Sequence, residues 1–312
     1  FPILAAIYLV LRPTQNQRVL WWSILLPCTL MIHPYTFAML VALWLADLLD
    51  KLVIQKKISV LMVLLEIVCA SSTTILIAWQ AGYFMNVSPG ETGFGTYRMN
   101  LLALFDPSGF DAANWSYLYA LPWVRANNNY EGFVYLGLGL MTVLLISLPM
   151  MTRQRDKFVK LLGQHIFILL CLICLTLFAL SNNIGIGPWT FSIPLTPKLF
   201  SIASILRASA RMFWPVFYVI AITGIYFLIR GYSKKVATTV LGIALAIQIM
   251  DTSGAWLEIK HKINHPGAQP VSSLSDPFWV DAAQHYKKVV RVPVWNEQAI
   301  WEKFANYAAQ NQ

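Results

Sequence analysis

Long apolar runs, separated by short polar gaps, dominate the chain up to about residue 250. Runs of this length and apolarity predict helices that cross a bilayer, whose hydrocarbon core is about 30 Å thick. The runs comprise residues 1–11, 19–49, 58–83, 133–151, 165–180, 212–229 and 236–250.

The run 19–49 is too long for one membrane helix, since it would extend for about 46 Å. It contains His33-Pro34 near its middle. Proline removes a backbone donor and disfavours helix at the residue before it. We therefore expect a hairpin of two short helices broken at His33-Pro34, which makes about eight transmembrane helices in all.

Composition supports an all-α polytopic membrane protein, with 57% hydrophobic residues, 12% charged residues and a mean hydropathy of +0.58. The net charge of +9 does not indicate nucleic acid, because the basic residues form no patch. If 19–49 is a hairpin, most of them fall in short loops on one side, which the positive-inside rule makes cytoplasmic. These residues are Arg12, Arg18, Lys51, Lys56, Lys57, Arg153, Arg155, Lys157, Lys160, Arg230, Lys234 and Lys235.

The opposite, extracytoplasmic side then carries His33-Pro34 and the loops 82–131 and 181–211. We expect residues 1–252 to form the transmembrane domain and residues 253–312 an extracytoplasmic polar domain. In this tail a strand-like run, 288–294, lies between helical stretches 278–287 and 296–310, which predicts the start of a small, truncated α/β domain. The chain begins in mid-helix, so we expect a fragment.

Arg207 and Arg211 precede the apolar run 212–229 and have a spacing of i and i+4. In an α-helix both guanidinium groups would project from one face. Guanidinium forks onto phosphate oxygens, so this pair suits a lipid-linked phosphate, with Arg98 as a third cation. Simple anchoring of the helix end to headgroups remains an equal alternative.

Four other ionisable residues are candidates for chemistry. Glu131 and Asp106 are placed to act as a base or as metal ligands, or else as a helix cap and a turn residue. His33 lies at the tip of the hairpin, where it either has a function or bonds backbone freed by proline. Glu66 stands alone inside an apolar run, which leaves open proton-coupled transport or a buried interhelical hydrogen bond.

Cofactor motifs are absent from the sequence. No histidine or cysteine has metal-ligand spacing, although a divalent metal at the carboxylates stays open. There is no nucleotide-binding glycine motif, and therefore no indication of ATP hydrolysis.

Four motifs in order resemble a poorly characterised family of bacterial inner-membrane proteins that is similar to the GT-C class of membrane glycosyltransferases. The resemblance covers nearly the whole chain, and Ala210 stands where the family pattern has glycine. The motifs are His33-Pro34-Tyr35, Met99-Asn100-Leu101 running to Asp106-Pro107, Tyr130-Glu131-Gly132, and the segment from Arg207 to Pro215.

The resemblance implies transfer of a sugar from a polyprenyl-phosphate donor to a periplasmic cell-envelope acceptor. It places the acidic catalytic residue upstream of Phe1 and leaves this chain with the donor-binding half, in contact with membrane lipids. Arg207, Arg211 and Arg98 would bind the donor phosphate. The cavity would be lined by His33, Tyr35, Glu131 and Asp106. The alternatives are a lipid or oligosaccharide flippase or transporter, and a non-catalytic membrane scaffold.

Overall fold

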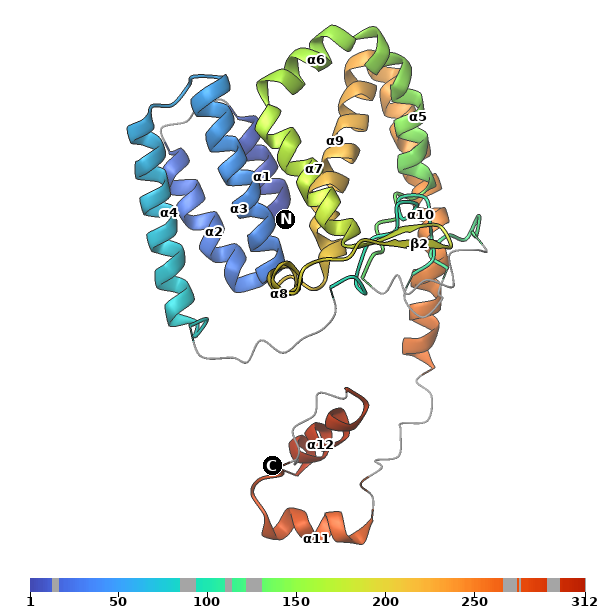
Figure 1. The fold of residues 1–312 in the computed structure, drawn as a ribbon. Helices are drawn as coiled ribbons and strands as arrows, with labels where there is room; N and C mark the ends of the chain where they lie inside the picture. The colour runs from blue at the N-terminus through green and yellow to red at the C-terminus, as the bar shows by residue number, and fades with distance from the viewer. Residues whose placement is uncertain are drawn as a thin grey trace. The chain divides into compact units, whose positions relative to one another are not determined.

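The computed structural model describes residues 1–12, 17–84, 94–109, 114–121, 131–265, 274, 276–290 and 298–311. It is mostly helical and divides into two compact units, Phe1–Ala255 and Trp256–Gln312 (Figure 1). The first unit contains α1 (Pro2–Leu11), α2 (Arg18–Ile32), α3 (Pro34–Leu49), the π-helix η1 (Asp50–Ile54), α4 (Val60–Gln80), α5 (Leu138–Arg153), α6 (Arg155–Gln164), α7 (Ile166–Leu180), β1 (Asn183–Ile186), β2 (Trp189–Ser192), α8 (Pro197–Ser204), the 3-10 helix η4 (Ser209–Phe213), α9 (Trp214–Gly231) and the start of α10 (Lys234–Asn264).

Three described helices are long and apolar enough to cross a membrane, which indicates a membrane protein. They are α4, the continuous segment Ser209–Gly231 and α10; α6 and α7, bent by 84°, would make a fourth span if taken together. The expected number of about eight is not supported. Most of the other predicted runs form helices of only 10–16 residues, and in some of them a glycine or a proline sets the boundary. Gly137, for example, has φ of +80°, and α5 begins only after it.

The predicted hairpin at His33-Pro34 is confirmed. His33 has an extended backbone (φ −165°, ψ 115°) between α2 and α3. Arg18 at the start of α2 forms an ion pair with Asp47 near the end of α3, so the two helices run antiparallel. The predicted gathering of basic residues on one side of the membrane requires this antiparallel arrangement, and Pro34 accounts for the break between the two helices.

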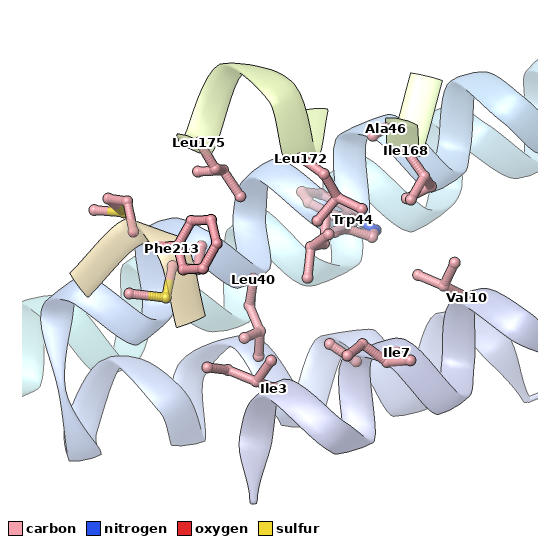
Figure 2. Packing of buried hydrophobic residues seen from close by; sticks show 14 of the residues in the cluster. Ile3, Ile7, Val10, Leu40, Trp44, Ala46, Ile168, Leu172, Leu175 and Phe213 are labelled. Carbon is pink, nitrogen blue, oxygen red and sulfur yellow. The ribbon is translucent and has the colours of Figure 1, made fainter. Parts of the chain in front are cut away.

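The main hydrophobic core is built around α3, which packs against α1, α2 and α7. Figure 2 shows side chains of α1 and α7 meeting those of α3, with Phe213 of η4 joining them. The core thereby ties the His33 turn to the start of α9. The labelled members are Ile3, Ile7, Val10, Leu40, Trp44, Ala46, Ile168, Leu172, Leu175 and Phe213.

A two-stranded antiparallel hairpin follows α7 and was not predicted. It pairs β1 with β2, with Asn183 opposite Ser192. The Asn100 amide holds its turn, because Nδ2 donates to the Gly187 carbonyl and Oδ1 accepts from the Gly187 N–H, at 2.9 and 3.0 Å. This contact fixes the segment that carries Arg98 against the loop 181–211.

Close packing between α5 and α10 depends on glycine at position 139. A Cβ atom at Gly139 would lie 2.1 Å from the Ala244 carbonyl oxygen. We expect Gly139→Ala to destabilise the first unit by about 1–3 kcal/mol, because the helices must separate. Gly242→Ala in α10 is the matched control, since no atom lies within 4 Å of its Cβ position. It should stabilise by up to about 1 kcal/mol. Thermal unfolding of both variants in detergent tests this, and equal effects would contradict it.

The second unit contains α11 (Pro277–His285) and α12 (Gln298–Gln310), which confirms the two helices predicted in the tail. They meet through the Trp279 ring, which contacts Phe304 and Tyr307. Residues 288–290 form no strand, and the rest of the strand-like run lies outside the described residues. α10 also continues to Asn264, beyond the predicted end at residue 250.

Candidate functional site

The stretch with Arg207 and Arg211 does not form the expected α-helix. Arg211 lies in the 3-10 helix η4, and Arg207 precedes it in irregular backbone. The two guanidinium groups therefore lie against different rings. That of Arg207 is 5.9 Å from the centre of the Tyr97 ring, and that of Arg211 is 5.2 Å from the centre of the Tyr35 ring. A tertiary contact replaces an α-helical hydrogen bond here, because the Ala210 N–H donates to the carbonyl of Tyr97 at 3.0 Å.

Arg211 is held by Glu131 and His33. Its Nε and Nη2 donate to the two carboxylate oxygens of Glu131 at 2.7 and 2.6 Å, which is a bidentate ion pair. Its Nη1 lies 3.0 Å from His33 Nε2. The side chains of Arg211 and Glu131 are 24% and 21% exposed, so the pair is accessible to solvent.

The contacts of His33 determine its protonation. Guanidinium can only donate, so Nε2 accepts from Arg211, while Nδ1 lies 3.4 Å from the Thr36 backbone N and 3.3 Å from Thr36 Oγ1. Burial, and then the charge of Arg211, lower the pKa of His33 below its ordinary value of 6.5. A neutral imidazole thus orients one edge of the Arg211 guanidinium.

The Tyr35 ring packs against the Arg211 guanidinium. Its hydroxyl accepts a hydrogen bond from the Ala208 N–H at 3.1 Å. The structure therefore brings together four residues singled out from the sequence, and three separate segments supply them. We call Arg211, Glu131, His33 and Tyr35 the arginine site.

Arg98 and Arg207 belong to segments that are bonded to the arginine site. The backbone of Arg98 lies against Gly132, where a Cβ atom would be 2.5 Å from the Arg98 carbonyl oxygen. Arg98 Nη2 donates to Thr190 Oγ1 of β2 at 2.7 Å. Three guanidinium groups and the carboxylate of Glu131 leave a formal excess of two positive charges.

Asp106 lies in a different group. Its side chain is 2% exposed, and Oδ1 accepts from the Ser108 N–H at 3.0 Å, which is the turn role considered as an alternative. Burial raises the pKa of the Tyr119 hydroxyl, and the charges of Asp251 and Asp106 raise it further. Asp106 therefore lies close to Tyr119, as Asp251 does.

Asp251 of α10 was missed by the sequence analysis. It is fully buried and accepts hydrogen bonds from the Ser116 hydroxyl, from the Tyr135 hydroxyl at 2.7 Å and from the Leu138 N–H at 2.9 Å. These hydrogen bonds attach Ser116, on one side of Glu131 in the chain, and Tyr135 and Leu138, on the other side, to α10. The available signal was a carboxylate directly after an apolar run, which has to be satisfied by a partner.

Glu66 is not solitary, which corrects the sequence interpretation. Its Oε2 accepts from Arg18 Nε and its Oε1 from Trp44 Nε1, both at 2.7 Å. Arg18 also pairs with Asp47, and the Lys51 ammonium lies 3.1 Å from the same carboxylate. We call Arg18, Asp47, Lys51 and Glu66 the buried ionic cluster. The alternative of a buried interhelical hydrogen bond at Glu66 is confirmed.

Metal binding gains no geometric support from the part of the chain that the structure describes. No three histidine, cysteine, aspartate or glutamate side chains there gather in a way that could hold a metal ion.

These features define a helical membrane protein with an accessible arginine–carboxylate site at one end of its main core. The family model described as "Domain of unknown function (DUF6311)" matches residues 1–253, and the chain belongs to that family. Neither a curated protein nor a solved structure matches the chain.

Proposed function

We propose that this chain is the donor-binding part of a GT-C-like glycosyltransferase of the bacterial inner membrane. It would bind a polyprenyl-phosphate-linked sugar at the arginine site and present it to a periplasmic cell-envelope acceptor.

The observation that supports this proposal most directly is the arrangement of Arg211. Its Nε and Nη2 edge already holds one carboxylate in bidentate geometry, which is the same geometry that guanidinium uses for phosphate. A polyprenyl-phosphate-linked sugar is a phosphodiester with one negative charge, and its leaving group is a phosphate monoester with up to two, so an excess of positive charge favours breaking of the glycosidic bond. Arg211 lies in η4, directly before α9, so its positive charge is near the end of the membrane-length segment Ser209–Gly231.

In this proposal each residue has a distinct role. Arg211 binds the donor phosphate and stabilises the negative charge that grows on it as the glycosidic bond breaks. His33 and Tyr35 hold the guanidinium plane, and Arg98 and Arg207 add long-range attraction. Apolar surfaces of the neighbouring helices accept the polyprenyl chain.

The direct test is a titration of purified protein in detergent with a polyprenyl-monophosphate sugar. Polyprenol of the same chain length, which lacks the phosphate, is the control ligand. Binding that requires the phosphate and weakens with added salt supports the proposal, because the attraction is between charges. Equal binding of both ligands would overturn it.

Glu131→Gln should tighten binding of the donor phosphate about tenfold, because Glu131 occupies the guanidinium edge that the phosphate needs. The amide keeps the shape of the side chain and removes the competing charge. The same titration measures the effect, and Glu258→Gln, an exposed carboxylate of the second unit, is the control. Weaker binding in Glu131→Gln would mean that the carboxylate serves the ligand and does not compete with it.

A flippase or transporter remains the second candidate, but its main sequence argument has changed. An unpaired Glu66 would have favoured proton coupling, whereas the observed Glu66 is bonded to Arg18 and Trp44. Loss of function at Glu66 would therefore not separate transport from glycosyl transfer.

A further inference from the structure

The helix α6 is bent by 84° from α7, the helix that follows it (Figure 1). It joins α5 to α7, and none of its residues is buried. If α7 runs along the membrane normal, α6 lies in the membrane plane. A short helix in that plane has to satisfy both headgroups and acyl chains.

The sequence of α6 fits that position. Arg155, Lys157 and Lys160 are exposed, and Asp156 is its one acidic residue. Its apolar arc contacts the protein through Phe158, whose ring centre lies 5.4 Å from that of Phe227. Two other apolar residues of α6 are exposed, Val159 by 55% and Leu161 by 43%.

Other exposed cations come to the same end of the unit. The Tyr232 hydroxyl donates to the Ile146 carbonyl of α5 at 2.9 Å, which places the turn between α9 and α10 beside the α5–α6 end. Gln55 Nε2 donates to the Gln164 carbonyl at 3.0 Å, which brings in the loop before α4. The exposed cations contributed by these loops are Lys56, Lys57, Arg153, Arg230, Lys234 and Lys235.

We propose that α6 is an interfacial helix that binds anionic phospholipid headgroups at this end of the unit. Lys157, Lys160 and Arg155 contact the phosphates, while Val159 and Leu161 enter the outer part of the acyl region. The apolar side chains interleaved with the cations favour lipid over a soluble polyanion. This proposal is independent of the arginine site, which lies at the opposite ends of α7 and α9.

The test uses the full chain in detergent, titrated with phosphatidylglycerol or with phosphatidylcholine, and bound lipid is counted by native mass spectrometry. We expect wild-type protein to prefer phosphatidylglycerol. The triple variant Arg155→Gln, Lys157→Gln and Lys160→Gln should lose at least tenfold of that preference.

The matched control removes three exposed lysines elsewhere: Lys260→Gln, Lys287→Gln and Lys288→Gln. It should keep the wild-type preference, and both variants should unfold at the wild-type temperature in neutral detergent because all six positions are exposed. Retained preference in the α6 variant, or equal loss in both variants, overturns the proposal. Displacement of the lipid by a soluble acidic peptide of equal charge would also overturn it and assign the surface to a protein partner.

Discussion

Replacing Arg18 by methionine is expected to cost the first unit about 3–5 kcal/mol of its free energy of unfolding. Arg18 is 6% exposed and is bonded to both carboxylates of the buried ionic cluster. Without it, Asp47 keeps its ion pair with Lys51, whereas Glu66 loses its bonded cation and keeps the hydrogen bond from the Trp44 indole. A buried carboxylate with no cation is the source of the penalty.

The measurement is thermal unfolding of the full chain in detergent, where we expect the midpoint to fall by roughly 10 °C. Arg12→Met is the matched control, because Arg12 is exposed and its guanidinium lies 4.6 Å from the centre of the Tyr8 ring. It should cost less than about 1 kcal/mol. Adding Glu66→Gln to Arg18→Met should recover much of the loss, because it removes the unpaired charge. If the double variant is less stable than Arg18→Met, charge balance is not what the cluster provides.

This cluster also shows where reading the sequence failed. Arg18 and Lys51 were counted as loop cations of the cytoplasmic side, yet both are buried. Their carboxylate partners are 29 and 48 residues from Arg18 along the chain. A pattern of hydrophobicity places a helix, but it does not say which face of that helix meets another. The ion pairs depend on those faces.

Features governed by local chemistry were predicted well. Proline determined the break at His33, and the apolar runs determined where most helices lie. The close approach of Gly139 to α10 follows from the missing side chain. The number of spans was overestimated because apolarity alone does not show where a helix ends. Asp251 shows the same limit, since its partners come from loops distant in sequence.

The arginine site was predicted in part. Arg211, His33, Tyr35 and Glu131 were each chosen from the sequence, and they meet in the structure. The reason given for the pair of arginines was nevertheless wrong, because η4 is a 3-10 helix that starts after Arg207. The backbone bond from Ala210 to Tyr97 decides that geometry, and it connects segments more than a hundred residues apart.

Arg211→Ala is expected to weaken binding of the polyprenyl-monophosphate sugar by roughly 100-fold, since charge-assisted hydrogen bonds contribute about 1.5–3 kcal/mol each. Arg211→Lys should fall between this variant and wild type, because lysine keeps the charge and loses the bidentate fork. Arg207→Ala should have a smaller effect, since its guanidinium stacks over Tyr97, whereas that of Arg211 holds the Glu131 carboxylate. Ligand titration of the purified full chain gives all three values.

The Arg211→Ala variant also leaves Glu131 without its partner, and that carboxylate would itself repel a phosphate. The double variant Arg211→Ala, Glu131→Gln separates the two effects, because it removes the repulsion together with the attraction. If Arg211 binds the phosphate, the double variant stays at least tenfold weaker than Glu131→Gln alone. Arg230→Ala, at the other end of α9, controls for the loss of one arginine near the membrane. Wild-type affinity in the double variant would make Arg211 a headgroup anchor, and transport or scaffolding would then be the better account of this family.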